Sequence, residues 1–140
     1  LHPRTRNNLE RFGLLGELDA PGFLLLPPQG YLEMLGLMSG AKMVLTGSGG
    51  IQEETTALGV PCLTIRENTE RPITVDQGTN TMVGIDPEAI IAGARDILAT
   101  GGKAGRIPEL WDGATGERIA AHLHQWLAAH EARTPVQSSP

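Results

Sequence analysis

The segment KMVLTGSGGIQEE, residues 42–54, determines the fold that the rest of the chain can adopt. Its apolar run at residues 43–45 has the length and β-branched content of an internal strand in a parallel sheet. A glycine-rich run, TGSGG at residues 46–50, follows at once, and residues 51–58 continue at helical spacing. The segment therefore predicts a buried strand, a tight turn and a helix, in that order.

The turn between that strand and that helix is a candidate phosphate-binding site. Gly49 and Gly50 fall at the helix N-terminus, where unpaired backbone N–H groups and the positive end of the helix dipole face outward. Glycine also lets a ligand approach the backbone more closely than a Cβ would allow, and Ser48 adds a hydroxyl donor. Glu54, one helical turn further on, has a carboxylate at a reach suited to ribose hydroxyls. The alternative is that the turn is only a tight connection.

Two better-known phosphate loops do not fit this turn. A Walker loop ends in Gly-Lys-Ser/Thr, whereas the glycines here lead into Ile51 and Gln52. A dinucleotide-binding fingerprint requires a third Gly or Ala for close packing of the helix, and Gln52 occupies that position. Glu67, an acidic residue after the next predicted strand, keeps the dinucleotide alternative open.

Length and composition limit the classes of protein to which the chain can belong. Its 140 residues are one domain of ordinary size, long enough to bury a core. The formal net charge of −5 and the few aromatic residues argue against nucleic acid as a partner. No apolar run approaches the roughly 20 residues that span a bilayer, so we expect neither a membrane partner nor a signal peptide. Cys62, the only cysteine, is predicted to be a buried strand residue in a cytoplasmic protein.

Strands and helices are predicted to alternate along the chain. Residues 1–3 have the pattern of the end of an incomplete strand, and residues 4–14 that of a helix with Leu9 and Phe12 turned inward. Further strands are predicted at residues 23–26, 61–65 and 81–84, and short helices at residues 31–38 and 72–77.

Two longer helices are predicted in the last third of the chain. The first begins at Asp86, a cap that is followed by a proline and an acidic residue. Its predicted buried stripe consists of Ile90, Ile91, Ala94, Ile97 and Leu98. The second, residues 115–129, has one apolar face that consists of Ile119, Leu123, Trp126 and Leu127. We expect this face to be incompletely covered, and residues 131–140 to form a disordered tail.

Alternating strands and helices predict an α/β fold with a parallel sheet and helices on both faces. Ligands of such sheets bind at the carboxyl ends of the strands. This rule selects three loops, at residues 27–31, 47–50 and 66–71, together with His2. His122 and His124 are two residues apart on a helix and do not share a face, so no metal site is expected.

Several further motifs occur in one order along the chain. After the glycine turn come GVP at residues 59–61, RENTERP at 66–72 and GTN at 78–80. The sequence opens with HPRT at residues 2–5 and later has WDGATGERI at 111–119. With these motifs the chain resembles the non-hydrolysing UDP-N-acetylglucosamine 2-epimerases over almost its whole length.

The resemblance implies that residues 1–130 are a Rossmann-like, UDP-binding domain, the C-terminal half of a two-domain fold of the glycosyltransferase-B type. The implied reaction interconverts UDP-N-acetylglucosamine and UDP-N-acetylmannosamine by elimination of UDP and its re-addition to a bound glycal. The proton-transferring carboxylates would belong to an N-terminal domain of roughly 200 further residues before Leu1. We expect a homodimer for the full-length protein and no cofactor. The alternatives are the donor half of a B-type glycosyltransferase and a stand-alone nucleotide-binding module.

The resemblance also implies roles for individual residues at the nucleobase. Gln29, with the segment that runs to Met34, would lie at the uracil. The family commonly has an aromatic residue at the position aligned with Met34, and Tyr31 is the candidate to replace it. His2, at a predicted strand end, is a candidate for contact with the substrate or with a neighbouring effector molecule.

The remaining implied roles concern the diphosphate and the ribose. By resemblance, Ser48, Gly49 and Gly50 bind the diphosphate and Glu54 binds the ribose. Arg71 would lie near the diphosphate and the sugar as a catalytic residue, because its guanidinium can donate to two oxygens and keeps its charge. The alternative for Arg71 is an ion pair with Glu70 or Glu67 in a surface loop.

Overall fold

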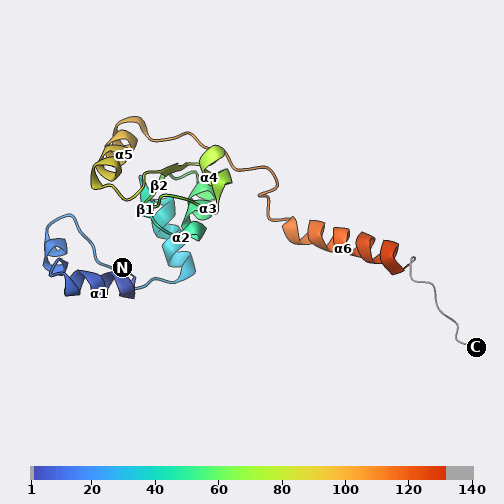
Figure 1. Cartoon of the computed structure of the whole chain (residues 1–140), viewed down its shortest axis with the longest axis horizontal. Helices are drawn as coiled ribbons and strands as arrows, with labels where there is room; N and C mark the ends of the chain where they lie inside the picture. The colour runs from blue at the N-terminus through green and yellow to red at the C-terminus, as the bar shows by residue number, and fades with distance from the viewer. Residues whose placement is uncertain (1, 132–140) are drawn as a thin grey trace, which may run out of the picture. The chain divides into compact units, whose positions relative to one another are not determined.

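The computed structural model describes residues 2–131. The chain divides into two compact units, residues 1–41 and residues 42–140. Figure 1 shows both units, with most of their helices and strands labelled.

The first unit begins with the helix α1, Pro3–Arg11. His2 is its N-cap: the backbone is extended there, and Nδ1 accepts a hydrogen bond from the Arg4 N–H at 3.2 Å. Because Pro3 already belongs to the helix, the strand predicted at residues 1–3 is absent from His2 and Pro3, and Leu1 lies outside the described residues. Phe12, predicted to face inward, is exposed.

The rest of this unit consists of a short 3-10 helix, η1 (Leu15–Asp19), and the helix α2 (Tyr31–Ser39). The strand predicted at residues 23–26 is wrong, because residues 23–30 have no regular structure and none of the described segments pairs with them. Leu24 is 79% exposed. An apolar run forms a strand only where a neighbouring strand accepts its hydrogen bonds, and the sequence does not show whether one is present.

The second unit is built on a parallel sheet of three short strands, in the order β1 (Val44–Thr46), β2 (Cys62–Thr64) and β3 (Asn80–Met82). Val44 pairs with Cys62, and Cys62 pairs with Asn80. The crossover from β1 to β2 contains the helix α3, Gly49–Leu58, and that from β2 to β3 the helix α4, Pro72–Asp76. All three strands lie within two residues of the predicted positions.

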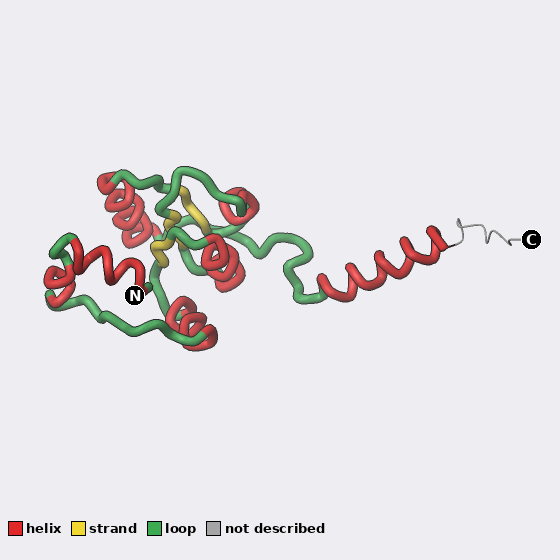
Figure 2. The backbone as a smooth tube through the Cα atoms, turned by 60° about the horizontal axis from the view of Figure 1, so that its bottom comes forward, coloured by secondary structure: helices red, strands yellow, loops and turns green. Residues whose placement is uncertain are grey.

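Helices cover both faces of this sheet, as predicted (Figure 2). Alternation along β2 sets the two faces: Thr64 donates to Asn80, which donates to Gln52 of α3, whereas Leu63 points the other way. On that other face the helix α5, Pro87–Thr100, packs closely through Gly93, where a Cβ would lie 3.3 Å from a methyl carbon of Leu63. The thiol of Cys62 is fully buried, as predicted.

The helix α5 begins as its sequence predicts, but its buried stripe is narrower. Asp86 is the N-cap, and its side chain accepts from the Glu88 N–H at 3.3 Å. Ile97 is buried, whereas the predicted core residues Ile91 and Leu98 are exposed. Each lies one residue outside the buried stripe, and a step of one residue rotates the side-chain direction by about 100° around the helix axis.

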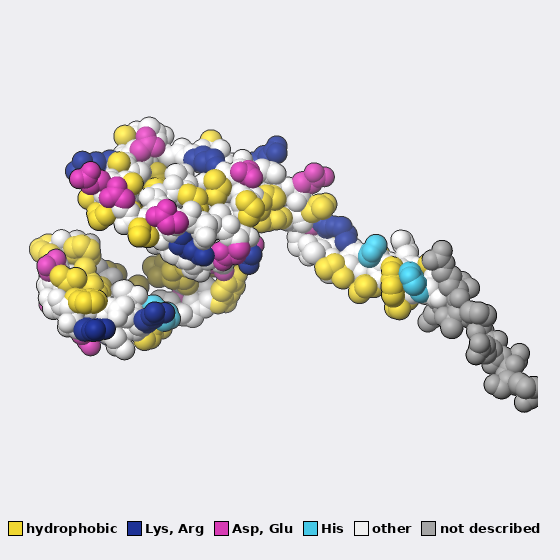
Figure 3. All heavy atoms as spheres, viewed as in Figure 1, with side chains coloured by type: hydrophobic (Ala, Val, Ile, Leu, Met, Phe, Trp, Pro, Cys, Tyr) yellow, Lys and Arg dark blue, Asp and Glu magenta, His cyan; other side chains and the backbone are white. Residues whose placement is uncertain are grey.

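The last helix, α6, spans Thr115–Glu131 and presents the apolar face that its periodicity predicts. The face is incompletely covered, as expected: Trp126 is 50% exposed and stacks on the ring of His130 with centroids 3.9 Å apart. Hydrophobic side chains follow one edge of this helix in Figure 3. The predicted tail lies outside the described residues except for Glu131, which belongs to α6. Among the described helices, none is long and apolar enough to cross a bilayer.

Candidate nucleotide-binding site

The turn after β1 leaves hydrogen-bond donors available to a ligand. The backbone N–H of Ser48 donates to Thr46 Oγ1 at 3.0 Å, which fixes the bend. Ser48 is the N-cap of α3, yet its hydroxyl makes no capping hydrogen bond and is exposed. Among residues 2–131, nothing accepts a hydrogen bond from the N–H groups of Gly49 and Gly50. The helix N-terminus therefore has the unpaired donors and the positive dipole end that suit an anion.

The loop after β2 brings a carboxylate to this helix end. A Cβ built at Gly49 would lie 2.6 Å from Oε1 of Glu70, so only glycine permits this approach. Arg66 pairs with the same carboxylate, with Nη1 3.1 Å from Oε2. The pKa of Glu70 is lowered, chiefly by a hydrogen bond to its own backbone and then by the charges of Arg66 and Arg71. The two loops predicted at residues 47–50 and 66–71 are thus brought together.

Arg71 lies beside α3, although with a partner that the sequence did not indicate. Its Nε is 2.9 Å from Oε1 of Glu53, at ion-pair distance but outside hydrogen-bond geometry. A second nitrogen, Nη1, donates to the Glu70 carbonyl at 3.4 Å. The side chain is 41% exposed. Glu53, and not the side chain of Glu70 or Glu67, therefore holds the guanidinium at the surface of α3.

Glu54 lines a shallow cavity of about 300 Å³ together with Glu53, Ala57 and Trp111. Its carboxylate is half-buried and has no ion-pair partner among the described residues. Leu110, directly before Trp111, has a φ of 69°, a left-handed conformation that is uncommon for a residue with a side chain. A carboxylate beside an indole ring suits a ligand that has hydroxyl groups and an apolar face.

The sequence interpretation missed a buried polar cluster next to this turn. Gln52 and Asn80 are fully buried, and the Asn80 Nδ2 donates to Gln52 Oε1 at 3.1 Å. The Thr69 hydroxyl donates to Gln52 Oε1, and Thr74 Oγ1 accepts from Asn80 Nδ2. The signal was present in the sequence, because Gln52 is a polar residue on the inner side of the predicted helix α3. Only the fold, however, shows which residues it meets.

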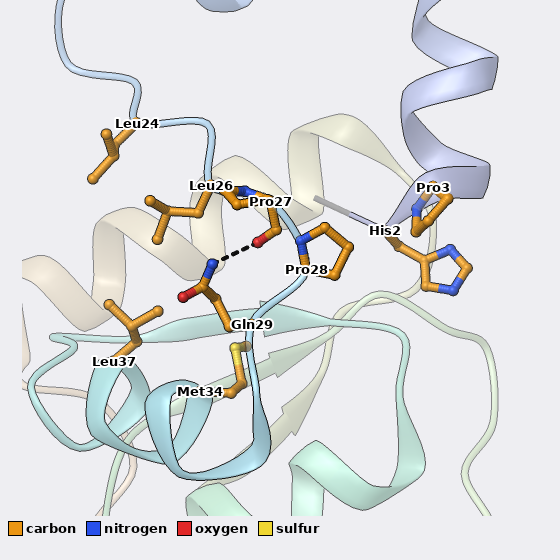
Figure 4. Close-up of a pocket in the computed structure, with 9 residues that line it drawn as sticks. All are labelled: His2, Pro3, Leu24, Leu26, Pro27, Pro28, Gln29, Met34 and Leu37. Carbon is orange, nitrogen blue, oxygen red and sulfur yellow. Dashed lines mark hydrogen bonds between the residues drawn. The ribbon is translucent and has the colours of Figure 1, made fainter.

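The first unit has a separate cavity of about 400 Å³ that contains three of the predicted site residues, His2, Gln29 and Met34. Figure 4 shows Gln29 held against the chain, its Nε2 donating to the Pro27 carbonyl at 2.7 Å. Tyr31, the candidate replacement for the aromatic residue at Met34, is 65% exposed and does not line this cavity. Met34 therefore shares this cavity with Gln29, and Tyr31 does not.

The protein-family model for UDP-N-acetylglucosamine 2-epimerase matches residues 1–124. The chain belongs to the UDP-N-acetylglucosamine 2-epimerase family. The match contains the glycine turn, the loop with Arg71 and the first turns of α6, and it confirms the resemblance that the motifs indicated.

Curated relatives place the chain among sugar-nucleotide epimerases. The UDP-N-acetylglucosamine 2-epimerase of Methanocaldococcus jannaschii is 42% identical over 124 residues, which are 88% of this chain and 33% of that protein. The enzyme of the same name from Methanococcus maripaludis is 49% identical over 92 residues, or 65% of this chain and 25% of that protein. The chain therefore spans between a quarter and a third of these curated relatives.

Solved structures of the epimerase family share the fold. The M. jannaschii UDP-GlcNAc 2-epimerase in complex with UDP-GlcNAc and UDP aligns with a TM-score of 0.73 at 40% identity, covering 89% of this chain and 34% of that one. The enzyme from Neisseria meningitidis bound to UDP-GlcNAc aligns at 0.60 and 37% identity, covering 71% of this chain and 26% of that one. These neighbours confirm the predicted α/β class and its place in a glycosyltransferase-B-like fold. They favour the epimerase over the glycosyltransferase alternative.

Proposed function

We propose that this chain is the UDP-binding part of an enzyme that interconverts UDP-N-acetylglucosamine and UDP-N-acetylmannosamine by elimination and re-addition of UDP. The observation that carries the proposal is the turn after β1, where the hydroxyl of Ser48 and the N–H groups of Gly49 and Gly50 are unpaired within the described chain. A relative that is 40% identical was solved with UDP-GlcNAc and UDP, which supports the same ligand class for this chain.

The diphosphate binds at the N-terminus of α3 in this proposal. Elimination leaves a UDP whose terminal phosphate gains negative charge, so hydrogen bonds from Ser48, Gly49 and Gly50 strengthen as the bond to the sugar breaks. Arg71 adds a guanidinium that keeps its charge throughout. The same contacts retain the cleaved UDP, which the reaction requires because the nucleotide is added back.

Glu54 binds the ribose in this proposal. Its carboxylate has no ion-pair partner among residues 2–131 and faces a cavity, so its oxygens can accept hydrogen bonds from both ribose hydroxyls. Trp111, on the wall of the same cavity, provides an apolar surface for the sugar ring. Glu53, which is adjacent in sequence, is engaged with Arg71 and is not a ribose ligand.

The first unit contributes the nucleobase contacts, with Gln29 and Met34 at the uracil and Tyr31 as the weaker candidate. Gln29 can offer its amide once its hydrogen bond to Pro27 is exchanged. His2 is proposed to contact the substrate. Its Nδ1 is occupied by the Arg4 N–H, so Nε2 is the nitrogen that remains for a ligand.

The whole enzyme needs more than this chain. We propose that the carboxylates that move the C2 proton belong to another domain of the protein, and that the full-length enzyme is a cytoplasmic homodimer. The single buried thiol, Cys62, is compatible with a reducing compartment. The chain alone should therefore bind nucleotide without turning it over.

Titration calorimetry with UDP, UMP and uridine tests the proposal. Hydrogen bonds to a charged group contribute about 1.5–3 kcal/mol each, and association entropy removes at least about 4 kcal/mol. Three such bonds, the helix terminus at up to about 2 kcal/mol and Glu54 on the ribose together contribute roughly 8–10 kcal/mol. The chain should therefore bind UDP with a Kd between about 10 μM and several mM. UMP and uridine should bind progressively more weakly. Equal affinity for all three ligands would show that the turn after β1 does not bind the diphosphate.

A further inference from the structure

The position of Arg71 is set by hydroxyl groups on both sides of its backbone. Its N–H donates to Thr69 Oγ1 at 2.9 Å, and its carbonyl accepts from the hydroxyl of Thr74 at 2.7 Å. The side chain that carries the charge is half-exposed, whereas the backbone from which it projects is fixed. Where the guanidinium can reach is therefore decided by these two threonines.

A pair of buried amides holds the two threonines in turn. Thr69 donates to Gln52 Oε1 at 2.6 Å, and Asn80 Nδ2 donates to Thr74 Oγ1 at 3.0 Å and to Gln52 Oε1 at 3.1 Å. Thr64, on β2, donates to the side-chain oxygen of Asn80, Oδ1, at 2.7 Å. The cluster links α3, the loop after β2, α4 and two strands.

Donor and acceptor chemistry fixes the direction of each bond, starting from Arg71. The Arg71 N–H can only donate, so Thr69 Oγ1 accepts from it. The hydrogen of the Thr69 hydroxyl must then go to another acceptor, which is Gln52 Oε1. The Arg71 carbonyl can only accept, so the Thr74 hydroxyl donates to it. The oxygen of the same hydroxyl then accepts from Asn80 Nδ2. The two amides then meet with an N–H on an oxygen. This arrangement satisfies the hydroxyls of Thr69 and Thr74, and it leaves Gln52 Nε2 without a partner among the described residues.

We infer that Thr69 is a positioning residue for Arg71, and that the buried amide pair of Gln52 and Asn80 holds it in that role. The inference rests on the proposed function, since it takes Arg71 to act on the diphosphate. It goes further by assigning the discrimination between UDP and uridine to side chains that do not touch either ligand. Because Gln52 belongs to the first turns of α3, the same cluster ties Arg71 to the helix end that binds the phosphate.

Variants of Thr69 test the inference without opening the core. Thr69 is half-buried, whereas truncation of Gln52 or Asn80 leaves buried polar groups unpaired and endangers folding. Thr69→Val removes the hydroxyl at nearly constant shape, and Thr69→Ser keeps it. A matched control is Thr56→Val, because Thr56 is buried and its hydroxyl has no partner among the described residues.

The measurement is the Kd of the 140-residue chain for UDP and for uridine, with thermal melts of every variant. Thr69→Val should weaken UDP by about twofold to tenfold, the equivalent of one net hydrogen bond, and leave uridine unchanged. Thr69→Ser and Thr56→Val should retain the affinity of the unchanged chain for both ligands. Gln52→Met, which keeps the volume and removes the amide, should lower the preference for UDP in the same direction.

A double-mutant cycle with Arg71→Ala separates positioning from a general effect on stability. If Thr69 acts through Arg71, Thr69→Val should have no further effect on UDP affinity in the Arg71→Ala background. An equal loss in that background, or an equal loss of uridine and UDP affinity, would overturn the inference while leaving the diphosphate site intact. An unchanged chain that binds UDP no better than uridine would overturn the proposed function and the inference together.

Discussion

Replacing Gly49 by alanine tests whether the N-terminus of α3 binds the diphosphate. A Cβ at this position would lie 2.6 Å from Oε1 of Glu70, so the carboxylate has to move. The new methyl group then occupies the space from which a ligand oxygen approaches the backbone N–H. Loss of one hydrogen bond to a charged oxygen costs about 1.5–3 kcal/mol, which corresponds to about a 10-fold to 150-fold weaker UDP affinity. Uridine, which has no phosphate, should bind as before.

The same substitution should leave the fold intact, which makes the affinity change interpretable. Gly49 is helical and has no positive φ, so alanine is free of backbone strain there. Alanine also favours a helix over glycine by up to about 1 kcal/mol. The displaced Glu70 side chain is at the surface, where its pair with Arg66 contributes little. Gly116→Ala, at an open position in the first turn of α6, is the control for helix propensity alone.

Calorimetric titration with UDP and uridine, together with circular-dichroism melts, distinguishes the outcomes for Gly49→Ala. A folded variant with weakened UDP binding and unchanged uridine binding supports the phosphate site at α3. A folded variant that binds UDP as tightly as the unchanged chain would refute the reasoning, because a ligand at this helix end has to meet the added methyl group.

Four further predictions concern Glu54, Cys62, Glu70 and catalysis by the chain alone. Glu54→Ala should weaken UDP by about tenfold or more, the equivalent of a hydrogen bond to a charged group, and barely affect pyrophosphate, which calorimetry can compare. The thiol of Cys62 is fully buried and burial raises its pKa, so Ellman's reagent should label it only when urea unfolds the chain. The pKa of Glu70 is lowered from its ordinary value of 4.5, so the ionised carboxylate stabilises the fold above pH 4.5 and this stabilisation is lost as the pH falls further. In Glu70→Gln the urea concentration at the midpoint of unfolding should depend less on pH across that range. The chain alone should not epimerise UDP-N-acetylglucosamine in a coupled assay or by NMR, and turnover would place the proton-transferring groups within these 140 residues.

The sequence predicted best the features that neighbouring residues determine. The order strand, glycine turn and helix at residues 44–58 is local, since β1 leads directly into Ser48 and α3. The start of α5 at Asp86 is local as well, because cap, proline and acid act within one turn. The rule for parallel sheets selected three loops, and two of them, around Gly49 and Glu70, do meet.

The features that the sequence did not predict depend on contacts between distant segments. The apolar run at residues 23–26 satisfies every local criterion for a strand, yet the described chain offers it no partner. Arg71 has several acidic neighbours in sequence, and its partner is instead Glu53, from the preceding helix. Periodicity predicted the helix α5 correctly but assigned Ile91 to its buried stripe, whereas Ile91 is exposed. A buried stripe predicted from sequence is uncertain in width by about one residue.

Gln52 shows how a departure from a familiar pattern carries information. A dinucleotide-binding turn has a small residue at this position so that the helix packs closely on the sheet. In this chain a glycine or alanine would leave the hydroxyl of Thr69 and one N–H of Asn80 without an acceptor, in a region where Asn80 is fully buried. The side chain that argues against the dinucleotide alternative is thus the one that couples α3 to the loop of Arg71. The helix end that we propose binds the phosphate and the cation beside it are consequently joined by Gln52, the residue that distinguishes this turn from its better-known relatives.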